Sequence, residues 1–261
     1  MHAVLLGASR GIGRTAALTL LESAENRVTL LLRNVETVKT DPAFKSFLSD
    51  GRVQIIQGDA YKVEDVRQLF VDHVDFVVFT LGATYPGKRP FSVTQGFLLP
   101  QPDICARGMC TLLQVLQELK QGVPKLLAIS VQGLGDSWDN LFLLQKSILP
   151  WLLRQTTDDK RGVEALLFRA SSSSLHSENP PMPSSQVINR AQFESINPRF
   201  LPHLVILRSP ALSEEAPGLE NDARVGEKVT TWKVSRQAVG RWIAREGWKE
   251  EFKNRAVMIG F

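Results

Sequence analysis

The sequence predicts an α/β protein in which a doubly wound, mostly parallel sheet forms a single domain. The first supporting observation is a glycine-rich turn between a short apolar run and a helix-like pattern near the start of the chain. The second is the alternation of short apolar runs with longer amphipathic stretches along the rest of the sequence. The third is a length of 261 residues with 43% apolar residues, which suits one such domain with a large core.

The glycine-rich turn follows the apolar run at residues 3–6 and contains Gly7, Gly11 and Gly13. We expect Gly7 to turn the chain out of the first strand, Gly11 to let the backbone approach a pyrophosphate, and Gly13 to let the helix pack closely on the sheet. The helix that begins here directs free N–H groups and the positive end of its dipole toward the phosphates. Because the turn joins a predicted strand to a helix, it indicates a dinucleotide site; the alternative is a plain strand-to-helix turn.

Alternating strands and helices account for the rest of the chain. Short apolar runs predict buried strands at residues 27–32, 52–57, 75–79, 125–129, 203–207 and 256–259. Stretches with helical spacing or strong apolar character predict helices at residues 41–48, 63–71, 103–121, 138–153, 157–169 and 235–246. Prolines and glycines indicate a loop at residues 84–102, and residues 224–234 suggest a small hairpin.

A Ser/Pro-rich insertion at about residues 171–199 interrupts this pattern. The strand pattern resumes after the insertion, so it is a loop or lid rather than a linker between domains. We therefore expect residues 1–261 to form one domain.

Two arginines near the turn indicate which dinucleotide binds. Arg33 follows the second predicted strand, where a carboxylate would instead bind the ribose 2′-hydroxyl of NAD(H), and Arg10 lies inside the turn. Two guanidinium groups favour a 2′-phosphate and hence NADP(H), unless Arg33 is only a solvated strand end. Asp59 follows the third strand and can accept hydrogen bonds around the adenine, cap the helix at residues 63–71, or do both, since the two roles are compatible. Together with the glycine turn and the residues after the fourth strand, the predicted cofactor-binding residues are Gly7, Ser9, Arg10, Gly11, Ile12, Gly13, Arg33, Asp59, Ala60, Leu81 and Gly82.

Charge and composition argue against several other classes of protein. The net charge is +4 with both signs interspersed, and neither a long basic run nor an aromatic ladder predicts nucleic-acid binding. Cys105 and Cys110 occupy different faces of a predicted helix, so we expect reduced thiols rather than a disulfide or a metal pair. The 4 histidines are scattered, and no metal site is expected. Without a leader or a membrane-spanning stretch, we expect a cytoplasmic monomer or homodimer that does not bind membranes.

Several short motifs form a set that is similar to one known superfamily. They are Gly7-x-x-x-Gly11-x-Gly13, Gly58-Asp59, Thr80-Leu81-Gly82-Ala83, Ile129-Ser130-x-x-Gly133, Leu207-Arg208-Ser209-Pro210-Ala211-Leu212 and Val234-Ser235-Arg236-x-Ala238-Val239. The set resembles the short-chain dehydrogenase/reductase superfamily, and looks most like its atypical branch with flavin reductase (the biliverdin reductase acting on the beta isomer) and the nitrogen-metabolite-repression type regulators. The resemblance implies a Rossmann fold of roughly seven parallel strands, with NADP(H) across the point where the strand order reverses. It also implies a substrate-facing loop after the sixth strand.

The sequence departs from that superfamily at the catalytic acid. Dehydrogenases of the superfamily carry Tyr-x-x-x-Lys with an upstream serine, and the matching place here reads Phe142-x-x-x-Lys146. The candidate catalytic residues that remain are Ser130 and Lys146. Ser130 either orients a substrate oxygen or ends its strand. The resemblance implies that Lys146 also binds the nicotinamide ribose; otherwise its stem lies along an apolar helix.

The missing tyrosine has a chemical consequence. Hydride delivery to an aldehyde or ketone forms an alkoxide that needs a positioned acid, whereas a flavin, quinone, tetrapyrrole or enone forms a delocalised anion that water can protonate. We therefore expect an NADPH-dependent reductase of a flat, aromatic or conjugated small molecule, with Tyr85, Trp138 and Phe142 in the substrate pocket. These aromatic residues otherwise belong to the core, the surface or a dimer contact.

Two other functions fit the same residues. A non-catalytic, NADP(H)-binding regulator that senses redox state would also have no need of the tyrosine. A carbonyl reductase would need an acid from elsewhere, and Tyr85 is the candidate.

Overall fold

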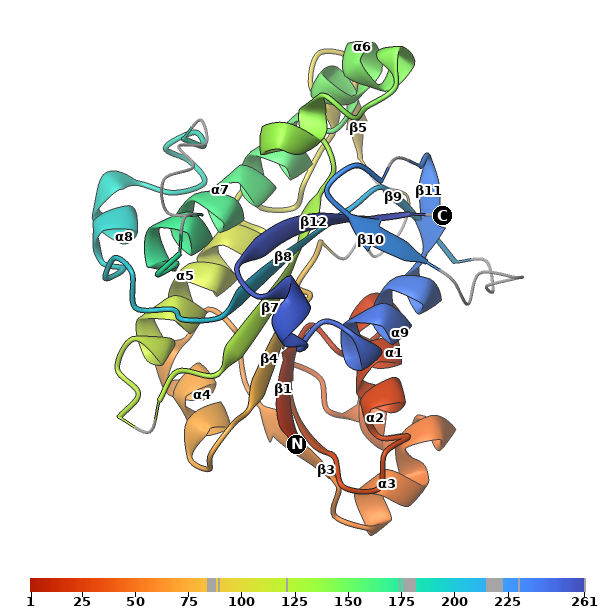
Figure 1. Cartoon of the computed structure of the whole chain (residues 1–261), viewed down its shortest axis with the longest axis vertical. Helices are drawn as coiled ribbons and strands as arrows, with labels where there is room; N and C mark the ends of the chain where they lie inside the picture. The colour runs from red at the N-terminus through yellow and green to blue at the C-terminus, as the bar shows by residue number, and fades with distance from the viewer. Residues whose placement is uncertain are drawn as a thin grey trace.

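An eight-stranded sheet forms the centre of the computed structural model (Figure 1), in the order β10-β12-β8-β7-β4-β1-β2-β3. Its strands are β1 (His2–Leu6), β2 (Arg27–Leu32), β3 (Val53–Gln57), β4 (Phe76–Phe79), β7 (Lys125–Val131), β8 (Leu204–Ser209), β10 (Arg224–Gly226) and β12 (Arg255–Gly260). Neighbouring strands are parallel, except that β10 runs antiparallel to β12. The structure describes residues 1–83, 88, 90–120, 122–173, 175, 182–214, 223–229 and 231–260. The predicted fold class is confirmed.

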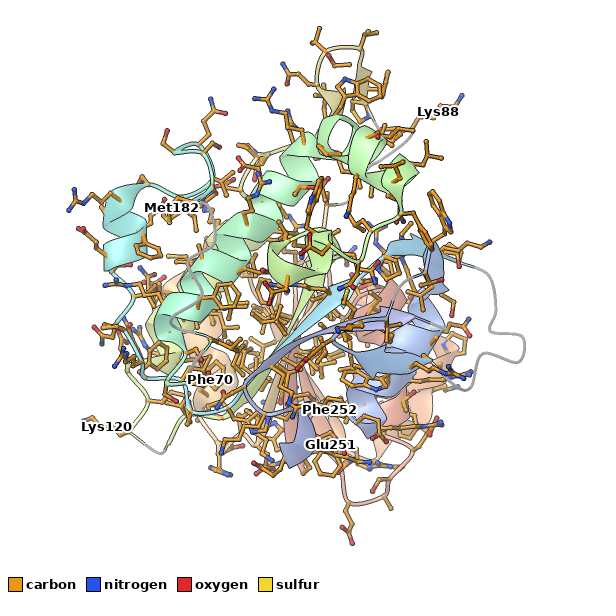
Figure 2. All side chains as sticks on the ribbon, turned by 45° about the horizontal axis from the view of Figure 1, so that its top comes forward. Phe70, Lys88, Lys120, Met182, Glu251 and Phe252 are labelled. Atoms are coloured by element: carbon orange, nitrogen blue, oxygen red, sulfur yellow. The ribbon has the colours of Figure 1, made fainter. Side chains whose placement is uncertain are left out.

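Helices cover both faces of this sheet (Figure 1). One face carries α4 (Val63–Arg67), α5 (Ile104–Leu116) and α7 (Arg154–Ala170), and the other carries α1 (Gly11–Leu20) and α9 (Arg236–Arg245). The remaining α-helices in the described ranges are α2 (Glu36–Lys39), α3 (Lys45–Ser49), α6 (Leu143–Leu152) and α8 (Arg190–Glu194). Figure 2 shows Lys88, Lys120 and Met182 at the periphery, outside the densely filled region around the sheet.

The helix α5 shows how apolar side chains hold a helical layer against the sheet. Met109, Leu112, Leu113 and Leu116 recur at helical spacing, and all four are fully buried between the sheet and α7. Burying each of these side chains stabilises the fold by roughly 1.5–3 kcal/mol relative to exposure. β4 is apolar along its whole length and β7 is apolar from Leu126 to Ile129, as a parallel sheet covered on both faces requires.

The strand order reverses between β1 and β4. The chain builds β1, β2 and β3 toward one side and then places β4 on the other side of β1. Thr80, directly after β4, ties the two strand ends together, because its N–H donates to Leu6 O at 2.9 Å and its Oγ1 donates to the same oxygen at 3.1 Å. Connections leaving the two strands diverge at this edge, which is where ligands bind in open α/β sheets.

The hairpin predicted at residues 224–234 is wrong. β10 pairs with the last strand, β12, whereas β11 (Lys233–Ser235) pairs in parallel with β9 (Ala211–Ser213) in a separate small sheet. The free edge of β12 offers unpaired backbone groups, and β10 satisfies them. This pairing joins segments that are distant in the sequence, so local alternation does not reveal it.

The loop and helix boundaries also need correction. The loop predicted at 84–102 contains the short strands β5 (Phe91–Ser92) and β6 (Gly96–Phe97), and the insertion at 171–199 contains α8. The helix predicted at 138–153 begins at Leu143, because Phe142 is extended and the side chain of Gln145 accepts its N–H at 3.0 Å. A 3-10 turn (Gly135–Trp138) precedes it. No helix in the described part of the chain combines the length and apolarity that crossing a membrane requires.

Candidate dinucleotide and substrate site

The glycine turn lies at the carboxyl end of β1, and its shape requires glycine. Gly7 has a φ of 96° and Gly11 a φ of 57°, both in the left-handed region. A β-carbon at Gly7 would lie 2.7 Å from the carbonyl carbon of Thr80, and one at Gly13 would lie 2.5 Å from Gly7 O. These positions therefore fit the roles predicted for Gly7 and Gly13.

Gly11 approaches a side chain from another part of the chain. A β-carbon at Gly11 would lie 3.0 Å from Cδ of Arg236, the first residue of α9. Arg236 belongs to one of the short motifs of the sequence, but the motif alone predicts no role for it. Its position over the glycine turn adds a cation to the predicted dinucleotide site.

The amino end of α1 is open to an anion. Arg10 occupies the N-cap with an extended backbone, and no side chain in the described ranges hydrogen-bonds there as a cap. The first turn holds no acidic residue. Ser9 and Arg10 are exposed, whereas Ile12 is buried beneath them. First-turn N–H groups of α1 can therefore face a phosphate, with the dipole favouring negative charge.

Arg33 and Asp59 follow neighbouring strands of the sheet. Arg33 is exposed directly after β2, so its guanidinium is accessible to a phosphate. Asp59 Oδ1 accepts the N–H of Tyr61 at 3.1 Å, and α4 begins with Lys62 at its N-cap without a side-chain cap. The helix-cap alternative for Asp59 is therefore wrong. Its second carboxylate oxygen suits the predicted role near the adenine.

Tyr61 is a neighbour of this region that the sequence analysis missed. The guanidinium carbon of Arg107 lies 4.8 Å from the centre of its ring, which is a cation–π contact. Burial raises the pKa of the Tyr61 phenol to about 12, so the phenol stays protonated at neutral pH. An aromatic residue right after Asp59 and the half-buried Ala60 was the available signal.

A buried lysine marks the carboxyl ends of β4 and β7. Lys160 on α7 is 8% exposed, and its Nζ donates to Ile129 O at 2.9 Å and to Leu81 O at 3.4 Å. Ser130, next to Ile129, is 3% exposed, and its Oγ has no hydrogen-bond partner within the described ranges. Lys160 Nζ thus lies at the carbonyl of the residue before Ser130 and at that of Leu81, which precedes the exposed Gly82.

Asp159 and Cys105 hold α7 against α5 beside this lysine. The Asp159 carboxylate accepts the N–H of Cys105 at 3.0 Å and that of Ala106 at 2.8 Å, so it caps α5. Burial raises the pKa of Asp159, and burial also raises the pKa of the Cys105 thiol to about 12. Cys105 is therefore a thiol that donates to Leu81 O, and it is not a nucleophile. Both Cys105 and Cys110 are free thiols, as predicted.

The predicted lysine, Lys146, lies elsewhere. Its Nζ donates to Asp139 O at 3.2 Å, just after the 3-10 turn, rather than to a carbonyl at the end of β4 or β7. Thr156 precedes Lys160 by one helical turn on α7, so Thr156-x-x-x-Lys160 reproduces the expected spacing. This pair was not predicted, because the helix was expected to begin at residue 157, whereas α7 begins at Arg154.

Aromatic side chains line the segment between β7 and α6. Phe142 stacks on Trp232 with ring centres 5.3 Å apart and planes 8° apart, and both rings are exposed. Gln132 Nε2 donates to Val229 O at 3.4 Å, which brings Val229 close to the residue that follows β7. Trp138 is exposed on the same segment. Tyr85, the other predicted substrate residue, lies outside the described residues, and Trp232 was not foreseen because its contact is non-local.

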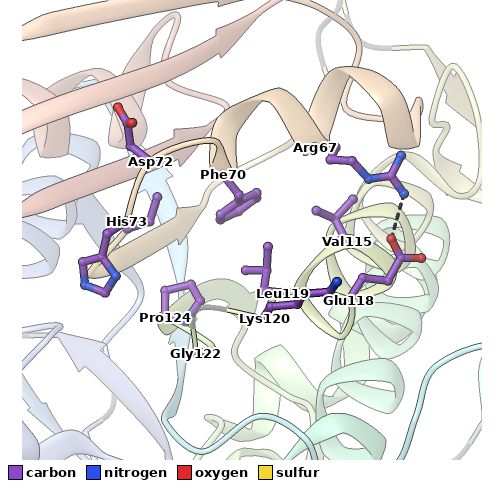
Figure 3. Close-up of a pocket in the computed structure, with 11 residues that line it drawn as sticks. Arg67, Phe70, Asp72, His73, Val115, Glu118, Leu119, Lys120, Gly122 and Pro124 are labelled. Atoms are coloured by element: carbon purple, nitrogen blue, oxygen red, sulfur yellow. Dashed lines mark hydrogen bonds and ion pairs between the residues drawn. The ribbon is translucent and has the colours of Figure 1, made fainter.

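A cavity in the described part of the chain lies away from these groups (Figure 3). It measures about 250 Å³ and is bordered by Phe70, Val74 and Pro124 and by the ion pair of Arg67 with Glu118. Val74 precedes β4 and Pro124 precedes β7, so the cavity lies at the amino edge of the sheet. Within the described ranges, no group of three His, Cys, Asp or Glu side chains is arranged to hold a metal ion.

The sheet order and the glycine cradle together define a dinucleotide-binding Rossmann protein. The sequence matches the NAD(P)H-binding family model over residues 7–176, which is more than half of the chain, and the protein belongs to that family. A comparison with curated proteins finds no match.

Solved structures with the same fold include several reductase-like proteins. A short-chain dehydrogenase/reductase from Veillonella parvula in complex with NADP is 15% identical, with a TM-score of 0.64, over 100% of this chain and 94% of that one. ChuY, an anaerobillin reductase from Escherichia coli, is 17% identical, with a TM-score of 0.59, over 99% and 96%. A short chain dehydrogenase from Burkholderia cenocepacia in complex with NADP is 15% identical, with a TM-score of 0.56, over 100% and 88%. The predicted superfamily resemblance is confirmed at the level of the fold.

Proposed function

We propose that this protein is an NADPH-dependent reductase that delivers hydride to a flat aromatic or conjugated acceptor. Arg10 and Arg33 support the choice of NADPH, because a guanidinium pairs well with a 2′-phosphate. The NADP complexes of the Veillonella parvula and Burkholderia cenocepacia proteins agree with that choice. The anaerobillin reductase ChuY supports the acceptor class by analogy of fold alone.

The observation that carries the proposal is Thr156 one turn before Lys160. A dehydrogenase of this superfamily would have a tyrosine at that spacing, and an aliphatic hydroxyl is a much weaker acid than a phenol. An alkoxide formed from a ketone would therefore lack the phenol that protonates it in such a dehydrogenase. A delocalised anion has no such requirement, because it can take its proton from water.

Lys160 and Ser130 provide orientation rather than acidity. An ammonium has three donors, and Lys160 uses two of them on Ile129 O and Leu81 O. The third donor and the unpaired Ser130 hydroxyl can bind oxygens of the cofactor ribose or the acceptor. The nicotinamide supplies the hydride when NADPH is bound, and the protein holds the two flat rings together.

The aromatic pair supplies the surface for the acceptor. Phe142 and Trp232 present nearly parallel rings beside the end of β7, and Trp138 lies on the same connection. Aromatic rings stack favourably on flat conjugated molecules in offset geometry. The proposed substrate is therefore a planar small molecule rather than a flexible aliphatic carbonyl compound.

The test compares acceptors with the purified protein. NADPH binding is first measured by tryptophan fluorescence, and NADPH oxidation is then followed with flavin mononucleotide, a quinone and a linear tetrapyrrole, beside aldehydes and ketones. Turnover with the conjugated acceptors and little with simple aldehydes is expected. Faster turnover with aldehydes would overturn the proposal, and tight binding without any turnover would favour an NADP(H)-sensing regulator instead.

A further inference from the structure

The side chain of Arg236 and the glycine turn come from opposite ends of the chain but meet at one place. Besides the 3.0 Å approach of Cδ, Nε of Arg236 would lie 3.6 Å from a β-carbon at Gly11. Arg236 is the first residue of α9, and Gly11 is the first residue of α1. The guanidinium therefore lies beside the N–H groups that would bind the cofactor phosphates.

The position of Arg236 is fixed by the packing of two parallel helices (Figure 1). A β-carbon at Gly240 on α9 would lie 2.7 Å from Ile12 O, so the helices touch along their first turns. At the far end, Arg245 on α9 pairs with Glu22 at 3.4 Å, just beyond α1. With both ends matched, α9 cannot slide along α1 without losing this close contact.

A carboxylate pairs with the guanidinium of Arg236. Arg236 NH1 lies 2.6 Å from Glu214 Oε1. The small sheet explains why, because Ser213 of β9 is in register with Ser235 of β11, and the next residues are Glu214 and Arg236. The Glu214 side chain is 81% exposed, whereas that of Arg236 is 31% exposed, so the carboxylate can leave more readily than the guanidinium.

We infer that Arg236 is a ligand of the cofactor pyrophosphate and that Glu214 competes with that pyrophosphate for the guanidinium. This inference rests on the proposed function, since it assumes the same dinucleotide site. A phosphate carries more charge-assisted acceptors than one exposed carboxylate, so binding exchanges a weak ion pair for a stronger contact. Arg236 lies outside the family match at residues 7–176, so the matched segment does not include it.

The arginine and the carboxylate should affect affinity in opposite directions. Arg236→Gln should weaken the binding of NADPH and of NADH by the same factor, about 10- to 100-fold, because both dinucleotides carry the pyrophosphate. Glu214→Gln should tighten both by about two- to fivefold, the range expected for removing an exposed competing ion pair. Arg245→Gln is the matched control, since it removes an Arg–Glu pair at the far end of α9 and should leave both affinities unchanged.

The experiment measures the dissociation constants of NADPH and NADH for the full chain by fluorescence titration, with a thermal melt of each variant. Equal losses in Arg236→Gln together with a gain in Glu214→Gln support the inference. Wild-type affinity in a folded Arg236→Gln protein overturns it while leaving the proposed function intact. If Arg236→Gln does not fold, the Glu214→Gln variant provides the test. Wild-type dissociation constants for NADPH and NADH in Glu214→Gln would then overturn the inference. A wild-type protein that binds neither dinucleotide would overturn the proposed function as well.

Discussion

Lys160 donates a hydrogen bond from Nζ to the carbonyl oxygen of Ile129 at 2.9 Å. This contact joins α7 to the end of β7 and fixes an ammonium group beside the Ser130 hydroxyl. Lysine and serine therefore meet at the carboxyl edge of the sheet, although thirty positions separate them in the sequence. The first prediction follows from this pair.

Lys160→Met should lower kcat/KM for the best acceptor by about 10- to 100-fold, because the variant loses its donors to the ligand oxygens. It should also lower the free energy of unfolding by roughly 1–3 kcal/mol, since buried Ile129 O and Leu81 O lose a donor. Steady-state kinetics and urea denaturation measure the two effects. Lys146→Met is the informative comparison: a larger kinetic loss there would show that Lys146, not Lys160, is the functional lysine.

Arg33→Asp should weaken the binding of NADPH far more than the binding of NADH. The exposed guanidinium after β2 favours a 2′-phosphate, and a carboxylate there would repel the phosphate and accept the 2′-hydroxyl of NADH instead. The expected change in the ratio of the two dissociation constants is at least about 10-fold. Fluorescence titration with both dinucleotides measures it. Equal weakening of NADPH and NADH would show that Arg33 does not contact the 2′-phosphate.

Gly13→Ala should destabilise the protein and abolish tight dinucleotide binding. Its β-carbon would lie 2.5 Å from both Gly7 O and Thr80 Oγ1, so α1 must move away from the ends of β1 and β4. Overpacking of this kind costs roughly 1–3 kcal/mol. Gly51→Ala is the control, because Gly51 has a φ of 69° but open space around it, which leaves backbone strain alone. Both variants should melt earlier, yet only Gly13→Ala should lose affinity for NADPH.

Stability should fall on mild acidification, in part because of His2. Burial is the largest cause that lowers the pKa of His2, and the neutral ring is held by His73 O at 2.8 Å and Thr29 Oγ1 at 2.8 Å. The unfolded chain therefore takes up a proton first as the pH falls below about 6.5, so stability is present above that value and decreases below it. Between pH 7 and pH 5 the free energy of unfolding of His2→Gln should decrease less than that of the wild type.

Urea denaturation at the two pH values measures this difference. Burial also lowers the pKa of His203, so the free energy of unfolding of His2→Gln should still depend on pH to some extent. The double variant with His203→Gln should show a smaller pH dependence than His2→Gln. Identical pH dependence in the wild type and the double variant would contradict this explanation.

Features set by local sterics could be predicted from the sequence. The glycine turn was predictable because a side chain at Gly7 or Gly13 would collide with the turn itself or with Thr80, at the end of β4. The strands were predictable because a sheet covered on both faces requires continuous apolar runs. NAD(P)H binding followed from the same turn, and the family match confirms it.

Features set by distant partners could not be predicted in this way. β10 pairs with β12 rather than with β11, a choice that depends on which sheet edge is free. The stacking of Phe142 on Trp232 depends on a similar long-range approach. The position of Lys160 could have been foreseen only by starting its helix at Arg154, and polar residues at the start of α7 concealed that boundary.

The place of β12 in the sheet has a consequence for folding during synthesis. β12 lies between β8 and β10, so β8 keeps an open edge until residues 255–260 have left the ribosome. The preceding helix α9, which brings Arg236 to the turn, is also translated late. A nascent chain with every strand up to β8 already made thus still exposes a row of unsatisfied amides, and it needs shielding from aggregation until the final strand is inserted.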